Sequence, residues 1–192
     1  WLNYGTIFGA KSKPIMKLQS LKPSRIKNRV NLVFDDGSYL PFLVDEALKL
    51  GLKTGQEVNF MELKEKSTNY LAREYALRQI ALSPKTEKLL RRKLLHKFPN
   101  FLPDQLIQEL KPYLEETQYI NYILKRFKDR SNREISYRLK LAGINYQSQE
   151  NDLAKIKALL KKKPKTTFAS LIRKGFAYDD VKSTFDKLTS IE

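Results

Sequence analysis

The sequence predicts a mainly α-helical protein, built from tandem repeats of three-helix units that form an elongated curved body behind a small N-terminal cap containing a β-hairpin. Two observations predict this class. Apolar residues recur at helical spacing from Asn69 onward. A short helix with an apolar anchor and basic residues also occurs three times, around Leu94, Leu139 and Leu171. The anchors are 45 and 32 residues apart, which indicates a degenerate repeat rather than a strict solenoid.

The N-terminal third predicts the small β-rich cap, over residues 23–68. Residues 1–22 show no consistent period and are left unassigned, with Met16 a candidate natural start. Within Ser24–Val44, two stretches of alternating apolar and polar residues flank the turn Asp35–Ser38, as in a hairpin. After it we expect a short helix stopped by a glycine, and then a strand or helix start; these two stretches are Asp45–Leu50 and Glu57–Leu63.

Three helical units are expected after the cap, over residues 69–113, 114–153 and 154–192. Their predicted helices are Leu71–Leu82, Ser83–Phe98 and one from Pro103; Glu116–Lys128, Asn132–Ala142 and one from Gln149; and Ala154–Lys162, Thr166–Lys174 and Tyr178–Leu188. The last boundary need not interrupt a helix, because Gln149–Lys162 contains no helix breaker.

The second helix of each unit has a distinctive pattern. In Ser83–Phe98, an apolar ridge of Leu90, Leu94 and Phe98 faces away from a basic stripe of Lys85, Lys88, Arg92 and His96. Ser83 with Glu87 resembles a capping box. Gly143 and Gly175 follow the second helices of the other two units, where a helix end favours positive φ. The residues expected to pack in the preceding helix are Tyr75, Leu77 and Ile80, and in the helix from Pro103 they are Leu106, Ile107 and Leu110.

The charge balance favours a polyanionic partner. The 192 residues contain 37 Lys and Arg against 21 Asp and Glu, a net charge of +16. The excess is concentrated in residues 71–192, with 26 basic and 14 acidic residues. There is no Cys, which excludes disulfides and thiol catalysis and fits a reducing cytoplasm. No apolar run is long enough to span a membrane.

Residues that could support catalysis are few, and we expect no enzyme, no cofactor and no metal site. His96 is the single His and belongs to a basic face. Asp35-Asp36 fit turn chemistry, while Glu115-Glu116 and Asp179-Asp180 stand at helix starts, where the dipole favours acids. No glycine-rich phosphate loop is present.

Basic clusters at matching places in each unit form the candidate surface for a polyanion such as DNA. Its members are Lys88, Arg91, Arg92, Lys93, Lys125, Arg126, Lys128, Arg130, Arg133, Arg138, Lys161, Lys162, Lys163, Lys165, Arg173 and Lys174. Such a surface contacts phosphates without reading sequence. The alternative is that these residues form ordinary solvated helix faces. The aromatic residues Tyr75, Tyr119, Tyr122 and Phe127 are interpreted as core rather than as platforms for bases.

Several motifs, in order, resemble the bacterial RecX regulatory family. Leu90–Leu94 is similar to its E-L-R-x-K-L helix, with Leu89 in place of Glu, and Tyr113–Tyr119 resembles its Y-L-D-D-x-x-F stretch. Glu134–Ile144 resembles a family helix that ends in Gly-Ile. Leu171–Val181 is close to the L-x-R-[RK]-G-F ending. The cap also resembles the N-terminal extension of Gram-positive members, so that the resemblance covers about 24–188. Ser131-Asn132 departs from the usual Gly-Pro.

This resemblance implies a non-enzymatic modulator of the RecA recombinase in DNA repair. Family members lie along the groove of the RecA–DNA filament, bridge protomers and usually inhibit filament extension, strand exchange and coprotease activity. The implied partners are the RecA filament and, more weakly and without sequence preference, DNA; we expect a cytoplasmic monomer. The alternatives are a nucleoid-associated DNA-binding protein that acts without a recombinase, and a structural adaptor, which would leave the charge excess without a role.

Overall fold

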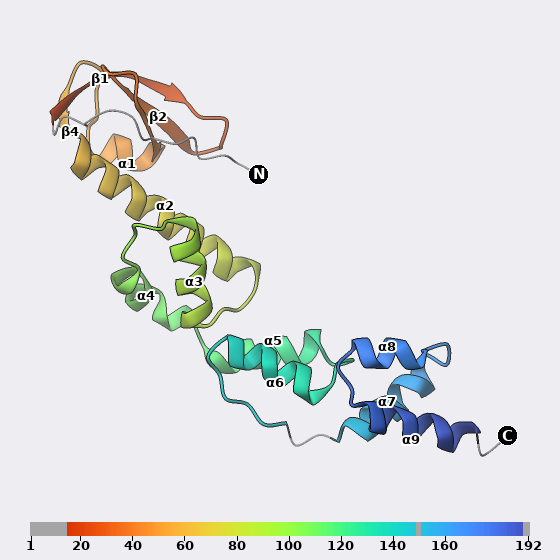
Figure 1. Cartoon of the computed structure of the whole chain (residues 1–192). Helices are drawn as coiled ribbons and strands as arrows, with labels where there is room; N and C mark the ends of the chain where they lie inside the picture. Colours follow the sequence, from red (N-terminus) through yellow and green to blue (C-terminus); the bar gives the residue numbers. More distant parts are fainter. Residues whose placement is uncertain (1–14, 149–150, 190–192) are drawn as a thin grey trace. The chain divides into compact units, whose positions relative to one another are not determined.

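The computed structural model describes residues 15–148 and 151–189 (Figure 1). The chain divides into two compact units. The first contains the residues up to 78 together with 94–103, and the second contains residues 79–93 and those from 104 on. We describe each unit by itself. The predicted division of the helical region into three units of three helices stays a prediction.

The first unit contains a four-stranded antiparallel sheet with strand order β3-β2-β1-β4. Its strands are β1 (Ile15–Pro23), β2 (Arg29–Phe34), β3 (Tyr39–Leu43) and β4 (Glu57–Asn59). The predicted hairpin is confirmed as β2 and β3, with Val33 opposite Tyr39. In its turn, Gly37 has φ +80°, and the backbone N–H of Ser38 donates to Asp36 Oδ1 at 2.8 Å. Strand β1 lies in the stretch that the sequence left unassigned.

The core of this unit lies between one face of the sheet and the helices α1 (Val44–Lys49) and α2 (Phe60–Leu82). Alternate residues of the strands, such as Leu32 and Phe34, are buried, as period-2 patterning requires. Phe34 meets Phe60 edge to face, with ring centroids 5.0 Å apart. The predicted short helix is confirmed as α1, and Gly51 follows it with φ +62°.

Helix α2 begins at Phe60, well before the helix start expected at Leu71, so it crosses the expected boundary between residues 68 and 69. The reason is that Phe60, Leu63, Ser67 and Leu71 repeat at intervals of three and four and bury one face of the helix. The sequence had offered Glu57–Leu63 as a strand or helix start, and β4 and α2 do begin there. The charged residues that follow Leu63 obscured the continuous helix. Leu77, expected to pack, is 44% exposed and was predicted wrongly.

The remaining chain is helical. Its elements are α3 (Glu87–Lys97), α4 (Asp104–Leu110), the 3-10 helix η1 (Lys111–Tyr113), α5 (Glu116–Arg126), α6 (Asn132–Leu141), α7 (Asp152–Lys162), α8 (Phe168–Arg173) and α9 (Tyr178–Thr189). Helix α7 runs without interruption through Leu153, as the absence of a helix breaker from Gln149–Lys162 had allowed. Its N-terminus is set by Asn151, whose side chain accepts a hydrogen bond from the Leu153 N–H.

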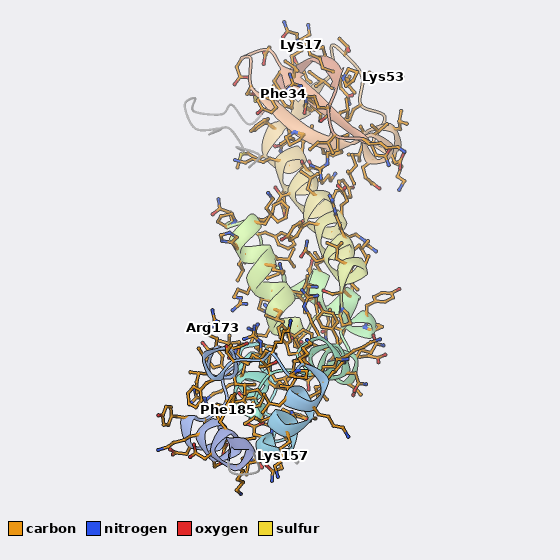
Figure 2. All side chains as sticks on the ribbon, turned by 90° about the vertical axis from the view of Figure 1, so that its right-hand side faces the viewer. Lys17, Phe34, Lys53, Lys157, Arg173 and Phe185 are labelled. Carbon is orange, nitrogen blue, oxygen red and sulfur yellow. The ribbon has the colours of Figure 1, made fainter. Side chains whose placement is uncertain are left out.

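Two apolar clusters account for part of the core of the second unit. Helices α5 and α6 pack around Ile123, Ile135 and Leu139, with Ile144 from the segment after α6. Helices α7 and α8 pack against α9 around Ile156, Leu171 and Val181, and Phe185 packs against this cluster while Arg173 and Lys157 remain exposed (Figure 2). The predicted anchors Leu94, Leu139 and Leu171 are fully buried, which confirms them as packing residues.

Candidate polyanion-binding surface

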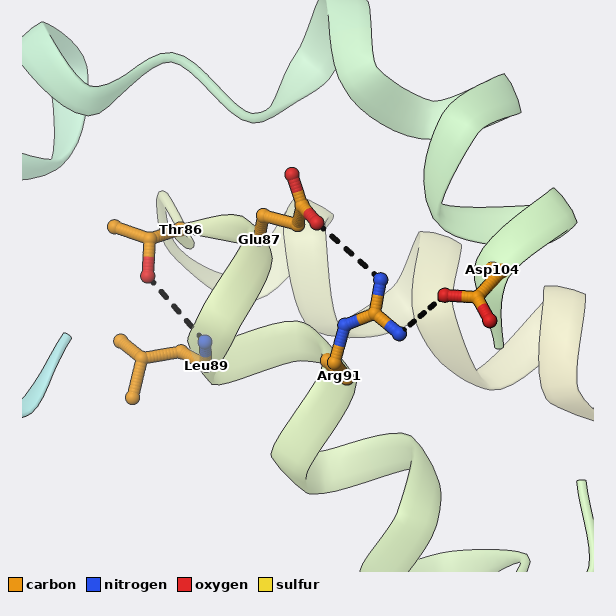
Figure 3. Close-up of polar contacts among 5 residues, drawn as sticks. All are labelled: Thr86, Glu87, Leu89, Arg91 and Asp104. Carbon is orange, nitrogen blue, oxygen red and sulfur yellow. Dashed lines mark hydrogen bonds and ion pairs between the residues drawn. The ribbon is translucent and has the colours of Figure 1, made fainter. Parts of the chain in front are cut away.

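The N-terminus of α3 differs from its prediction. The helix begins at Glu87 rather than near Ser83, and Thr86 is the capping residue. Thr86 is buried, its Oγ1 accepts a hydrogen bond from the Leu89 N–H at 3.3 Å (Figure 3), and the same hydroxyl donates to the Ala142 carbonyl at 2.7 Å. The Ser83–Glu87 spacing had suggested a box, but Pro84 and the residues around it form no helical turn.

Lys85, expected on the basic stripe, is 8% exposed. Its ammonium donates to the Ser83 carbonyl at 2.8 Å and also to the Ser83 hydroxyl. Burial, and to a lesser extent the positive charge of Lys93, lowers its pKa below the usual value. Lys85 is therefore a buried structural cation and offers no charge to a partner.

Arg91 belongs to the predicted surface but is already paired within the chain. Its guanidinium contacts Asp104 and lies 3.3 Å from a Glu87 carboxylate oxygen (Figure 3). The hydrogen bond that the Arg91 guanidinium donates to the Asp104 carboxylate is the largest cause that raises the Arg91 pKa. Because these contacts join the start of α3 to the start of α4, Arg91 has a structural role, and its substitution would perturb more than a binding surface.

Three further predicted residues have partners inside the chain. Arg138 pairs with Glu134 at 2.6 Å and stacks over the Phe127 ring, 4.2 Å from its centroid. Lys163 lies 3.3 Å from Asp129. Arg130 donates to the backbone carbonyl of Arg173 at 2.9 Å.

The other predicted cations include a group that is exposed and makes no ion pair within the described part of the chain. We call this group the exposed cations; it comprises Lys88, Arg92, Lys125, Arg126, Lys128, Arg133, Lys161, Lys162, Lys165 and Arg173. Lys93 and Lys174 are half-buried. All the exposed cations belong to the second compact unit. Uncompensated cations on one unit produce a positive potential that attracts polyanions.

A pair of end-to-end helix contacts within the second unit was not anticipated. The N-cap of α3, Thr86, bonds the carbonyl of Ala142 at the C-terminus of α6. In the same way, the N–H of Ser131, the N-cap of α6, bonds the carbonyl of Lys174 at the C-terminus of α8, at 3.2 Å. We call these the α6–α3 joint and the α8–α6 joint. The α6–α3 joint brings the C-terminus of α6 to the N-terminus of α3, and the α8–α6 joint brings the C-terminus of α8 to the N-terminus of α6.

The glycine after each C-terminus completes the joint. Gly143 and Gly175 have φ of +90° and +88°, as predicted for helix ends. A Cβ on Gly143 would lie 3.0 Å from Lys88 Cδ, and one on Gly175 would lie 2.8 Å from Ser131 Oγ. Glycine is therefore needed for its backbone conformation and for the close approach of the next helix. One sequence signal could have revealed these joints. Thr86 or Ser131 at a helix N-terminus is matched by Gly143 or Gly175 after a later helix.

The residues considered for catalysis lie apart from any recognisable site. His96 is exposed, Asp36 is in the hairpin turn, and Glu116 and Asp179 are in the first turns of α5 and α9. Among residues 15–148 and 151–189, no group of three or more His, Asp or Glu could hold a metal ion. In the same residues, no helix has the length and apolar character needed to cross a membrane.

Comparison with known proteins agrees with the resemblance of the motifs. The regulatory protein RecX of Clostridium tetani is 31% identical over 212 aligned residues, which cover 93% of this chain and 96% of that protein. The chain belongs to the RecX family. The RecX of Clostridium botulinum is 26% identical and covers 93% of the chain and 97% of the relative. No family model matches the chain. A crystal structure of a regulatory protein RecX covers 89% of the chain at 15% identity, with a TM-score of 0.44.

Membership of the RecX family places the chain among non-enzymatic regulators. The match extends over almost the whole length of both chains, so it includes the sheet of the first unit as well as the helices. Among the predicted binding residues, the exposed cations are those that lie on the surface and make no ion pair in the described part of the chain.

Proposed function

We propose that this protein binds RecA–DNA filaments through its exposed cations and modulates, by inhibition, the ATPase, recombinase and coprotease activities of RecA in DNA repair. Its membership of the RecX family over 93% of the chain is the observation that supports this function most strongly. The exposed cations on the second unit support it further, because a DNA-containing filament is a dense polyanion.

Filament binding through several units at once explains how short basic helices could act. A few surface charges give modest affinity on their own. Contacts from α3, α6 and α8 are tethered in one chain, so the second and third contacts are intramolecular and the total affinity rises steeply. The predicted three-unit repeat and its curved arrangement fit this mechanism. The protein would act as a monomer that bridges neighbouring RecA protomers.

Co-sedimentation with RecA–ssDNA filaments in the presence of excess competitor DNA tests the proposal. Arg92→Glu, Arg133→Glu and Arg173→Glu each reverse one exposed cation on a different second helix or its end. We expect each single variant to weaken filament binding and any pair to weaken it by more than either alone. Arg91→Glu is unsuitable because it also breaks the contacts with Glu87 and Asp104. Unchanged binding by all folded variants would refute the assignment of this surface.

The second candidate is a DNA-binding protein that acts without a recombinase, and the net charge of +16 favours it. Under the main proposal, binding to bare DNA is weak, falls with salt and is indifferent to sequence. Titration of several unrelated duplexes at stepped salt measures this. Tight binding to one sequence, with no retention on RecA filaments, would favour the second candidate.

A further inference from the structure

An open hollow of about 760 Å³ lies beside α6, outside the predicted binding residues. Ser136, Tyr137 and Lys140 line it from the helix. The four residues that follow Gly143, Ile144 to Gln147, line it from the segment after the helix. These side chains include two phenol rings, two amides, one hydroxyl and one ammonium, and none carries a negative charge. Such an open hollow with a lining of mixed polarity is unlike the enclosed apolar pockets that bind small molecules.

The two tyrosines are placed to hold a planar group. Tyr146 packs against the core of α5 and α6, so its ring is fixed. Tyr137 is 58% exposed, and its ring is available to a ligand. Among the described residues, neither Tyr137 nor Tyr146 contacts another aromatic ring. Tyr119, which the sequence indicated as a core residue, is buried and does not contribute to the hollow. The hollow therefore offers one anchored and one exposed aromatic surface.

Three cations belong to the elements that line the hollow or lie beside them. Arg133, Tyr137 and Lys140 share one face of α6, by their spacing of four and three residues. The side chain of Lys88 lies against Gly143, the residue that precedes the lining segment. Among the described residues, Lys88, Arg133 and Lys140 make no ion pair. The acids adjacent to them in sequence are paired with other residues, Glu87 with Arg91 and Glu134 with Arg138. The charge near the hollow is thus positive.

We propose that this hollow is a subsite for single-stranded nucleic acid, in which a base stacks on Tyr137 and the flanking phosphates contact Lys140, Lys88 and Arg133. Aromatic rings interleaved with cations are the combination that binds single strands without reading sequence. A duplex would offer the phosphates but keep its bases stacked inside, so the rings favour a single strand. The subsite deepens the proposed function and rests on its nucleic-acid contact.

The test measures binding of a fluorescent oligothymidylate and of an abasic oligomer of the same length, without RecA. Tyr137→Ala should weaken binding to oligothymidylate by about five-fold or more, the lower end for loss of one stacked base. It should leave binding to the abasic strand unchanged. Tyr137→Phe, which retains the ring, should bind like the wild type. Tyr113→Ala is the matched control, because Tyr113 is 61% exposed and lies outside the hollow.

Charge and stacking separate in the salt dependence. Lys140→Ala should weaken binding to both strands and make the negative slope of log K against log salt shallower by about 0.7. Tyr137→Ala should leave this slope unchanged. If Tyr137→Ala binds oligothymidylate like the wild type, or loses equal affinity for both strands, the subsite is refuted; equal loss would show that Tyr137 affects binding without stacking on a base. The RecA co-sedimentation assay is independent, so failure here is distinguishable from failure of the proposed function.

Discussion

The α8–α6 joint predicts that Gly175→Ala is unusually destabilising. Alanine at a φ of +88° enters the left-handed region, which costs about 1–2 kcal/mol. The new Cβ would also lie 2.8 Å from Ser131 Oγ and 3.2 Å from Glu134 Cβ. If the Ser131 hydroxyl turns away, its bond to the Glu134 N–H is lost, and loss of an N-cap costs roughly 0.5–2 kcal/mol. The total is about 1.5–4 kcal/mol.

Urea unfolding followed by far-ultraviolet circular dichroism measures this cost. Gly55→Ala is the matched control, because Gly55 has a similar φ of +87° but open space around the new Cβ. It should lose only the conformational part, about 1–2 kcal/mol. Gly143→Ala should fall between the two, since the Lys88 side chain that it meets is flexible.

A double-mutant cycle tests the contact itself. Ser131→Ala removes the hydroxyl that the new methyl group meets, so Gly175→Ala should cost about 1 kcal/mol less in the Ser131→Ala background than in the wild type. Additive effects, together with equal costs for Gly175→Ala and Gly55→Ala, would refute the reasoning that α8 meets the N-terminus of α6 through this glycine.

Three other variants probe the same unit. Thr86→Val should destabilise by about 1–3 kcal/mol in thermal melts, because it removes the cap of α3 and the hydroxyl that donates to Ala142, whereas Thr86→Ser should retain most of the stability; equal melting of the two would contradict the α6–α3 joint. Lys85→Met should change the pH dependence of stability. The pKa of Lys85 is lowered in the folded state, so between that pKa and the usual 10.5 the unfolded wild-type chain binds more protons than the folded chain. The stability of the wild type should therefore rise with pH across this window. The same rise in Lys85→Met would show that Lys85 is not its cause. Leu171→Asp places a carboxylate where the side chain is fully buried and should cost several kcal/mol and loosen α7 to α9; a melting curve like that of the wild type would show that the anchor is not required.

Local patterns predicted much of the fold. The hairpin, the short helix before Gly51 and most helices downstream of Asn69 have strong periodicity or turn residues, and each was found within a few residues of its expected place. Strand β1 was missed because a strand that pairs with two distant segments needs no period of its own beyond a few alternating residues. The predicted helix began too late, at Leu71, because the buried face of α2 also contains the polar residue Ser67, whose hydroxyl donates a hydrogen bond to the Pro41 carbonyl.

The candidate surface was predictable only as a set of residue types. Sequence gives the charge of Arg91, Arg138 and Lys163 but not their carboxylate partners, and it placed Lys85 in solvent although the residue is buried. Such pairs depend on how helices meet, which a single sequence does not state. Tyr137 was not singled out for the same reason: its proposed role depends on the segment after α6, which lines the same hollow.

The most direct test of the proposed function is the rate of ATP hydrolysis by RecA on single-stranded DNA, measured with increasing amounts of this protein. The proposal predicts that the wild-type protein lowers the rate, and that the combined variant Arg92→Glu, Arg133→Glu, Arg173→Glu, shown to be folded by circular dichroism, does so only at much higher concentration. An unchanged rate with the wild-type protein, or equal inhibition by the folded variant, would contradict the claim that the exposed cations bind the filament.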